Sequence, residues 1–326
     1  MSLAAAGGDS LFAEIRAASA EVARRARHVG IDDEALEELA GVLARERPAQ
    51  PSLDPAQRGL ADAARTLAFV ITLNAINFGS GWFPHLRKRD GMSGYLTIAT
   101  ALRERFEREG PWSAGQLEAI RPEDCARLFG QTLDPPAGEL MELFARALRD
   151  LGTFLSREHG ARFAGPVEEA RGSAERLVRI LARMPLYQDV ARYDGFDVPF
   201  YKRAQITCSD LAESLHERGL GRFHDLDALT LFADNLVPHV LRCLGVLVYS
   251  PDLAKRIDAE ELLPPGSAEE VEIRAAALHA VERLSGSCAR RGWRAPPRRL
   301  DHLLWSRGQS ARVKARPRHR TRCPYY

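Results

Sequence analysis

Apolar residues recur at three- and four-residue intervals along most of the chain, a spacing that predicts amphipathic helices rather than strands. In the first such segment Leu11, Ile15 and Val22 share one face, and Ser10 can cap a helix that continues to about Arg27. Equivalent patterns predict further helices over about residues 32–45, 55–76, 94–108, 122–130, 137–160, 166–185, 202–217, 238–247 and 267–290. The predicted fold class is therefore all-α, a multi-helix globular protein.

Two segments interrupt the helical pattern. Arg47–Pro55 is rich in proline and predicts a linker, while Asn77–Gly94 combines glycine, charge and aromatic residues and predicts a loop or a short hairpin. The only strand-like stretch is Phe196–Tyr201. We expect one domain over residues 1–326, built either as a single body or as two packed helical lobes of about residues 1–130 and 131–326.

Composition narrows the classes of protein that fit. Hydrophobic residues make up 45% of the 326 residues and the net charge is +2, so the chain can bury a large core and has no global field favouring DNA or membranes. The five cysteines lie far apart without any CxxC pair, which predicts reduced thiols and no zinc site. The first residues lack a signal-peptide pattern, and the longest apolar run is too short to cross a bilayer. We therefore expect a cytoplasmic protein without a membrane segment.

The motifs of the common enzyme classes are absent from the sequence. There is no GxGxxG, GxxxxGK[ST], HExxH or GxSxG pattern. His224-Asp225 resembles the pair of metal-dependent phosphohydrolases, but no second histidine–aspartate set accompanies it. We expect it to cap a helix that starts near Asp227, and we expect no metal site.

Lysine is scarce, because only four of the 46 basic residues are lysines. One of them, Lys202, stands at the predicted start of a helix beside Phe200 and Tyr201. A positive charge at a helix N-terminus opposes the helix dipole, so a functional role is attractive there. The alternative is a surface lysine whose stem covers apolar neighbours.

The segment Leu229–Pro238 predicts a helix, a tight turn and a second helix, with Asp234 and Asn235 at the turn. Phe232 and Leu236 flank them. A carboxylate in apolar surroundings suits acid–base chemistry or recognition of a base, and the alternative is a helix cap.

Asp301 and Trp305 lie four residues apart, hence on one face of a helix. A carboxylate beside an indole can stabilise a cationic transition state while the ring stacks on a base. The alternative is a partly buried cap next to a core tryptophan. After them, seven basic residues run from Arg307 to Arg322 and the chain closes in Tyr325-Tyr326, which predicts either a docked segment or a solvated tail.

Taken together and in order, these segments resemble one family, the queuosine-salvage proteins that act as queuosine 5′-phosphate N-glycosylases. The motifs that carry the resemblance are LNAINF (Leu73–Phe78), SGY (Ser93–Tyr95), FYKRAQ (Phe200–Gln205), LTLFAD (Leu229–Asp234), GVL (Gly245–Leu247) after Pro238, YS (Tyr249–Ser250), EVEIR (Glu270–Arg274), LD…LW (Leu300–Trp305) and RCxYY (Arg322–Tyr326). Two departures are the loop Gly79–Gly91 and Asn235, which stands where the family pattern is associated with tyrosine.

The resemblance implies a fold similar to helix-hairpin-helix DNA glycosylases, with the turn Asp234–Pro238 as counterpart of that hairpin. It also implies hydrolysis of queuosine 5′-phosphate to queuine and ribose 5-phosphate, without a metal or organic cofactor. Queuine is a 7-deazaguanine and lacks N7, the usual protonation site of a departing purine. Catalysis must therefore depend on stabilising a cationic sugar and on hydrogen bonds to the leaving base.

On this interpretation Asp301 acts on the sugar cation or the attacking water and Asp234 on the base edge or proton transfer, and the two roles could be exchanged. Lys202 completes the catalytic set and would also hold the 5′-phosphate, together with Arg320, Arg322 and Tyr326 from the C-terminal segment. Phe200, Phe232 and Trp305 would stack on the flat base. The expected substrate-binding residues are Phe232, Asn235, Trp305, Phe200, His302, Arg320, Arg322 and Tyr326. The partner is a small-molecule substrate, with no stable nucleic-acid complex expected. A DNA-repair glycosylase and a non-catalytic protein that binds a modified nucleoside or tRNA remain the alternatives.

Overall fold

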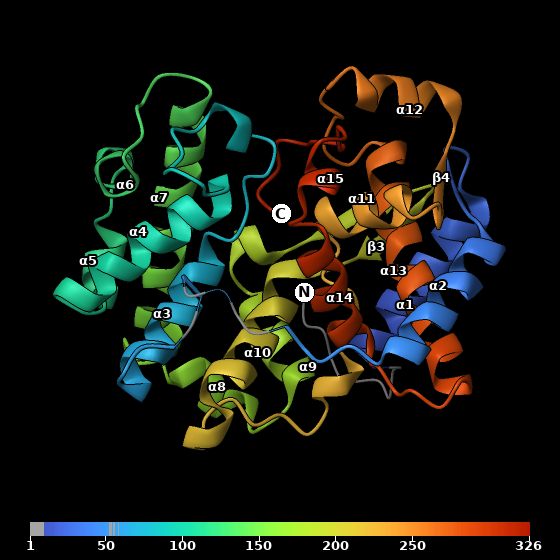
Figure 1. Cartoon of the computed structure of the whole chain (residues 1–326). Coiled ribbons are helices and arrows are strands. Elements are labelled where there is room, and N and C mark those ends of the chain that lie inside the picture. Colours follow the sequence, from blue (N-terminus) through green and yellow to red (C-terminus); the bar gives the residue numbers. More distant parts are fainter. Residues whose placement is uncertain (1–9, 52–53, 55, 58) are drawn as a thin grey trace.

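Helices dominate the computed structural model of the chain, which describes residues 10–51, 54, 56–57 and 59–326 (Figure 1). The predicted all-α class is confirmed, since the strands within these ranges are short and only form two-stranded pairs. The elements in chain order are α1 (Leu11–Arg25), β1 (Val29–Ile31), α2 (Asp33–Glu46), α3 (Ala63–Ala75), η1 (Phe83–His85), α4 (Gly94–Glu109), α5 (Ala114–Glu118), α6 (Pro122–Phe129), α7 (Ala137–Glu158), α8 (Gly165–Ala170), α9 (Ala174–Leu181), η2 (Pro185–Tyr187), β2 (Val190–Tyr193), β3 (Phe196–Pro199), α10 (Lys202–Leu215), η3 (His216–Arg218), η4 (Leu226–Ala228), α11 (Leu236–Cys243), β4 (Leu247–Tyr249), α12 (Pro251–Asp258), α13 (Ala268–Arg290), α14 (Pro297–Arg307) and α15 (Ala311–Lys314). No helix in the described ranges is long and apolar enough to span a bilayer.

Helix α13 organises the half of the molecule on the right of Figure 1. It packs against α1 and α2 from the beginning of the chain and against α11 and α14 from near its end. Even its charged residue Glu272 is fully buried, and its carboxylate accepts the backbone N–H groups of Arg27, His28 and Val29. Strand β1, which begins at Val29, pairs antiparallel with β4. This pairing joins the first helices to the C-terminal half.

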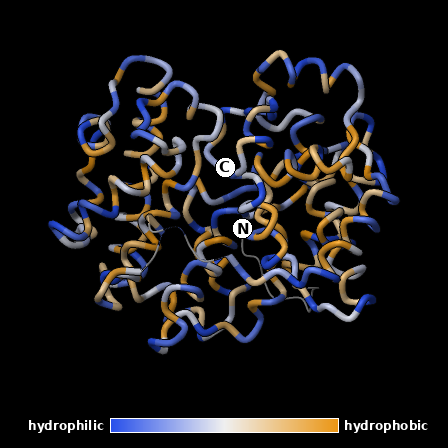
Figure 2. Tube along the Cα trace, in the orientation of Figure 1, coloured by the Kyte–Doolittle hydropathy of each residue, from blue (hydrophilic) through white to orange (hydrophobic). Residues whose placement is uncertain are grey.

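Helices α3 to α7 form the other half, on the left of Figure 1. The 22-residue α7 packs against α5 and α6, and α3 packs against α4 and α7. Helix α10 contacts α3 and α9 between the two halves. Hydrophobic positions face the interior of both halves, as the hydropathy trace in Figure 2 shows, and the buried residues form one connected cluster from Leu11 to Leu304. A boundary between lobes near residue 130 stays a prediction, although it falls between α6 and α7, which pack together.

Two of the predicted helices are shorter or broken. The helix expected over 166–185 is two helices, because Arg171 and Gly172 adopt left-handed backbone conformations with φ of 49° and 74°. Ser173 then caps α9 by accepting the N–H of Arg176. The helix expected from Pro55 begins only at Ala63, and Pro55, like part of the predicted linker before it, lies outside the described residues.

The predicted strand at Phe196–Tyr201 is confirmed as β3, although it ends at Pro199. Its partner β2 was missed by the sequence analysis, and the two strands form a hairpin. Asp194 and Gly195 both have positive φ, of 41° and 91°, which is the backbone geometry that a two-residue Asp-Gly turn provides.

The expected helix-hairpin-helix at Leu229–Pro238 is not confirmed. Residues 229–233 are not helical, and only the second helix, α11, is present. Gln205 explains the difference, because its side-chain oxygen accepts the N–H of Thr230 and its amide donates to the Thr230 hydroxyl. These bonds satisfy a non-helical backbone that would otherwise be unpaired in the core.

Asp225 caps a different helix from the one expected. Instead of serving the short η4, its carboxylate accepts the Ala174 and Glu175 N–H groups and the Ser173 hydroxyl at the start of α9. The pKa of Asp225 is lowered overall, because these hydrogen bonds outweigh the opposing effect of burial.

We predict that Asp225→Ala lowers the free energy of unfolding by about 1–2 kcal/mol, since a helix N-terminus loses its cap. Chemical denaturation measures this loss. Asp227→Ala is the control, because exposed Asp227 has its ion pair with Arg298 near the surface and should cost well under about 1 kcal/mol. Equal losses for both variants would contradict the capping role.

Candidate active site

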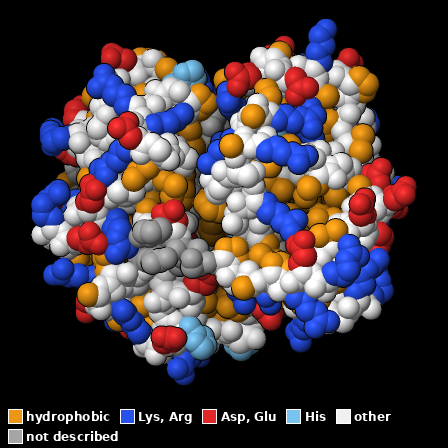
Figure 3. Space-filling model, viewed as in Figure 1, with side chains coloured by type: hydrophobic (Ala, Val, Ile, Leu, Met, Phe, Trp, Pro, Cys, Tyr) orange, Lys and Arg blue, Asp and Glu red, His pale blue; other side chains and the backbone are white. Residues whose placement is uncertain are grey.

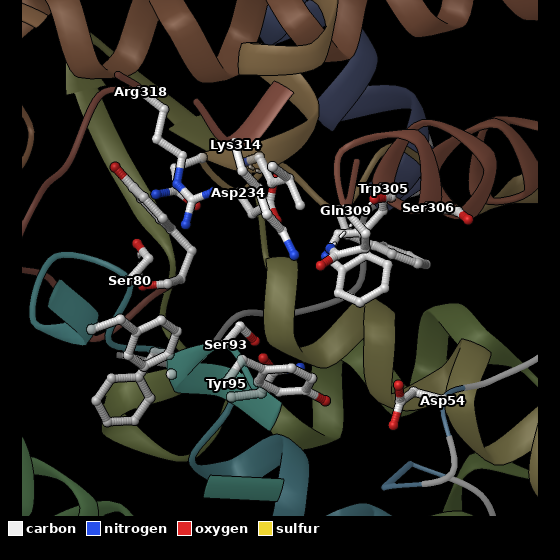
Figure 4. A pocket seen from close by; sticks show the side chains of 18 of the residues that line it. Asp54, Ser80, Ser93, Tyr95, Asp234, Trp305, Ser306, Gln309, Lys314 and Arg318 are labelled. Carbon is white, nitrogen blue, oxygen red and sulfur yellow. Dashed lines mark hydrogen bonds between the residues drawn. The ribbon is translucent and has the colours of Figure 1, made fainter. Parts of the chain in front are cut away.

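A cavity of about 650 Å³ opens between the two halves of the molecule, on the face shown in Figure 3. Its walls come from α10, α14, the loop that joins α3 to α4, the segment before α11 and the C-terminal segment. Figure 4 shows Asp234 and Arg318 on one side, Ser93 and Tyr95 opposite them, and Trp305 and Gln309 from the end of α14 on a third side. Segments that lie far apart in the sequence, between Pro51 and Tyr95 and between Lys202 and Tyr326, therefore build one pocket.

Asp301 lies buried in the wall of this pocket. Its Oδ1 accepts the backbone N–H of Phe232 at 3.1 Å. Burial raises the pKa of Asp301 to about 7, and the charge of Asp234 adds to that effect. Trp305 lines the same pocket one helical turn later, so the shared face predicted for the two residues is confirmed.

Asp234 lines the pocket and also caps α11. Its Oδ1 accepts the N–H groups of Leu236 at 2.8 Å and Val237 at 3.0 Å. Burial raises the pKa of Asp234, while the positive charges of Lys202 and Arg318 act in the opposite direction. Asp234 therefore caps α11 and lies in the pocket wall, and its role in acid–base chemistry or base recognition stays a prediction.

Lys202 is buried at the floor of the pocket rather than at the surface. Its Nζ donates to the backbone oxygen of Asn77 at 3.1 Å and to the Asn77 side chain at 3.3 Å. Burial lowers the pKa of Lys202 to about 8, although the charges of Asp234 and Asp301 favour the ammonium form. The alternative of a snorkelling surface lysine is therefore wrong.

A hydrogen-bonded chain leads from Lys202 to a third carboxylate, Asp210. Asn77 donates to Asn74 at 3.0 Å, and Asn74 donates to Asp210 at 2.8 Å. Burial raises the pKa of Asp210 to about 6. Asp210 was not among the predicted site residues, because one aspartate on a helix with mixed polarity resembles a solvent-exposed residue.

His302 lines the pocket with its ring against that of Phe232, at 6.0 Å between centroids. Its Nδ1 lies 2.9 Å from a carboxylate oxygen of Glu213. Burial alone would lower the pKa of His302, but the hydrogen bond and charge of Glu213, together with Asp301 and Asp210, raise it overall. The protonated form of His302 is therefore favoured relative to that of a free imidazole.

The C-terminal segment is docked, as one of the two alternatives predicted. His319, Thr321, Cys323 and Tyr326 are all buried. The N–H of Gly79 donates to the backbone oxygen of Tyr326, and the Tyr326 hydroxyl donates to Glu270 at 2.9 Å. The tyrosine end of the segment is therefore part of the core and of the pocket wall.

Comparison with known proteins fits this site. The family model described as queuosine salvage protein matches residues 57–326 of the sequence. The chain belongs to the queuosine salvage protein family. The resemblance predicted from the ordered motifs is confirmed.

Relatives with the name "Queuosine 5'-phosphate N-glycosylase/hydrolase" cover most of the chain. The protein from Sphaerobacter thermophilus is 37% identical over 94% of this chain and 95% of its own length. The proteins from Mus musculus and Dictyostelium discoideum are 30% and 32% identical, over 94% and 80% of this chain and 96% and 78% of their own lengths. These names support the prediction that this family member is an N-glycosyl hydrolase.

The structure brings most of the predicted site residues together. The pocket is lined by Lys202, Phe232, Asp234, Asn235, Asp301, His302, Trp305, Arg320 and Tyr326. Phe200 and Arg322 are not among its lining residues. Phe200 is fully buried, and the central carbon of the Arg274 guanidinium lies 4.0 Å from its ring centroid. The prediction that Phe200 stacks on the base is therefore wrong. Arg322 instead pairs with Glu139 at 3.3 Å.

Asn77, Tyr95, Lys314 and Arg318 are, like Asp210, among the further lining residues that the sequence did not single out as site residues. Asn77 and Tyr95 lie within the family motifs, which was the available signal. Arg318 gave none, because arginine is so common in this sequence that a single one carries little information. Lys314 stands in the basic run of the C-terminal segment, for which a solvated tail was one of the two predictions. Within the described ranges, no group of three or more histidine, cysteine or acidic side chains is arranged to hold a metal ion.

Proposed function

We propose that this protein hydrolyses the N-glycosidic bond of queuosine 5′-phosphate and releases queuine and ribose 5-phosphate. The observation that carries the proposal is the pocket in which Asp301, Asp234 and Lys202 meet, in a chain whose relatives are named for this activity. The substrate is the free nucleotide, without a stable nucleic-acid complex. The free cysteines in the described chain agree with a cytoplasmic location, where thiols stay reduced.

The chemistry of the leaving base explains the need for buried carboxylates. A 7-deazapurine cannot be protonated at position 7, so the sugar develops positive charge before the base departs. A carboxylate such as Asp301 stabilises that charge more strongly in a cavity than in water, or it orients the attacking water. Asp234 then serves the base edge or proton transfer, and the exchanged assignment is tested below.

Positive charge in the pocket favours a phosphorylated substrate, but the cations differ from those first assigned to the phosphate. Arg320 pairs with Glu260 at 2.9 Å and Arg322 with Glu139, so both guanidinium groups are already neutralised. The side chains of Arg318 and Lys314 line the pocket, and neither side chain forms an ion pair or hydrogen bond within the described residues. We assign the 5′-phosphate to Arg318, with Lys314 beside it.

Burial strengthens this assignment of Arg318. Loss of solvent lowers the pKa of its guanidinium, and the facing charge of Asp234 only partly compensates. A half-buried cation without an ion-pair partner carries a desolvation cost, and a bound dianionic phosphate offsets that cost. Lys202, which already donates to Asn77, remains with the carboxylates as the positive charge nearest the reacting bond.

We predict release of queuine and ribose 5-phosphate from queuosine 5′-phosphate, with a kcat/KM at least about 100-fold lower for unphosphorylated queuosine. The loss reflects a charge-assisted phosphate contact that the nucleoside lacks, at about 1.4 kcal/mol for each factor of ten. Mass spectrometry of the products measures both reactions. Equal efficiency on the two substrates would remove the phosphate site, and no queuine from either would refute the proposed function.

We predict that Asp301→Asn lowers kcat by about 10²–10³, because it preserves shape but removes a main electrostatic contact. In the wild type, turnover should rise with pH through about 7 as this carboxyl ionises, since its raised pKa keeps it neutral at lower pH. The variant should lose that rise. Steady-state kinetics from pH 5 to pH 9 give both quantities.

Asp234→Asn is the comparison for that experiment. It should slow turnover and also weaken binding of free queuine, because a base-edge contact already exists in the ground state, whereas Asp301→Asn should leave queuine binding near wild type. The reverse pattern would exchange the two roles. Turnover within about tenfold of wild type in both variants would place the reacting groups elsewhere.

We predict that Arg318→Gln raises KM for queuosine 5′-phosphate by about tenfold or more and leaves kcat/KM for queuosine nearly unchanged. Arg322→Gln is the matched control, because its guanidinium belongs to the same segment but pairs with Glu139 outside the pocket. Inhibition by ribose 5-phosphate should weaken in parallel with the KM. If Arg322→Gln has the larger effect on KM, the phosphate lies near Arg322 rather than near Arg318.

A further inference from the structure

Arg274 lies behind the active site on α13 and is not among the residues that line the pocket. Its guanidinium is buried and makes a two-pronged ion pair with Asp189, at 3.0 Å to Oδ1 and 2.7 Å to Oδ2. Its remaining nitrogen, Nε, donates to the backbone oxygen of Ala233 at 3.0 Å. Each of the three guanidinium nitrogens therefore donates a hydrogen bond.

The two hydrogen-bond partners of Arg274, Asp189 and the backbone oxygen of Ala233, lead directly to residues of the active site. Oδ2 of Asp189 accepts the backbone N–H of Lys202 at 3.1 Å, and the backbone oxygen of Asp189 accepts the N–H of Phe200 at 2.9 Å. Asp189 thus fixes the start of α10, from which the Lys202 side chain enters the pocket. Ala233 immediately precedes Asp234. The hydrogen bond from Arg274 to the backbone oxygen of Ala233 therefore fixes the chain just before Asp234.

The faces of the guanidinium reach a third segment. The ring centroid of Phe200 lies 4.0 Å from its central carbon, and that of Tyr326 lies 4.8 Å away. Tyr326 itself lines the pocket. A planar cation that bonds through its edge and stacks through its faces can hold three chain segments at once, which a lysine ammonium cannot do.

We propose that Arg274 is a positioning residue for the reaction, which sets the relative placement of Lys202, Asp234 and Tyr326 through Asp189 and Ala233. The inference rests on the proposed function. A buried ion pair is weak as a source of stability, but it specifies one arrangement of the elements that it joins. Lys202 and Asp234 influence each other's charge, so their spacing affects the protonation of both.

The test compares Arg274→Lys with Glu272→Gln, a matched variant on the same helix. Glu272 is equally buried, but it bonds the backbone of residues 27–29 and the hydroxyl of Tyr193, away from the pocket. Arg274→Lys should lower kcat on queuosine 5′-phosphate by about 10- to 100-fold, as expected for misplaced reacting groups, and change KM less. Glu272→Gln should lower thermal stability but keep kcat within about twofold of wild type.

A second measurement does not require turnover. Acylation of the Lys202 amine by acetic anhydride, followed by peptide mass spectrometry across pH 6 to pH 10, reports the apparent pKa of that lysine. It should be near 8 in the wild type and in Glu272→Gln, and displaced in Arg274→Lys. If the wild type releases no queuine, the proposed function fails while this titration still decides whether Arg274 positions Lys202.

Unchanged kcat and an unchanged Lys202 titration in folded Arg274→Lys would overturn the inference. Should that variant not fold, Asp189→Asn takes its place, because it keeps the side-chain volume and an oxygen for the Lys202 N–H but weakens the tie to Arg274. It should displace the Lys202 titration in the same way. A wild-type titration in folded Asp189→Asn would likewise overturn the inference.

Discussion

The burial of one ammonium group among several carboxylates is the constraint on which this site depends. Lys202, Asp210, Asp234 and Asp301 share the walls of one cavity, and burial shifts the pKa of each toward its neutral form. Each charge is tolerated because the opposite charge is near. The pKa values of about 6 to 8 for three of these groups place proton transfers within reach near neutral pH, which groups at their ordinary pKa values in water would not offer.

Such a cluster needs a rigid frame, and the frame is made of hydrogen bonds from side chains to the backbone. The backbone oxygen of Asn77 accepts a hydrogen bond from the ammonium of Lys202, and Gln205 bonds the non-helical segment before Asp234. Arg274 links both regions. Each of these three residues belongs to a different family motif. The motifs therefore describe the support of the site as much as its reacting groups, which explains why they are spread along the chain.

The same principle explains why two of the predicted site residues do not line the pocket. Phe200 and Arg322 belong to motifs, but one is a stacking surface for Arg274 and the other pairs with Glu139. Arg318, which lies in no motif, faces the pocket instead. Membership of a motif shows that a residue has a specific neighbour, and only the folded chain shows whether that neighbour is the substrate or another part of the protein.

The sequence by itself determined the helical class, most helix positions and the pairing of Asp301 with Trp305 on one face, because these depend on spacing and on caps within a few residues. It also indicated Asp234 and Lys202, a carboxylate in apolar surroundings and a lysine in an arginine-rich chain. Tertiary structure alone decided that residues 229–233 are not helical, that Asp210 faces the cavity, and which cations of the C-terminal segment have ion-pair partners. The physical reason is that each of these outcomes depends on a partner far away in the sequence. A local pattern contains no information about a hydrogen bond or ion pair that closes only when distant segments pack together.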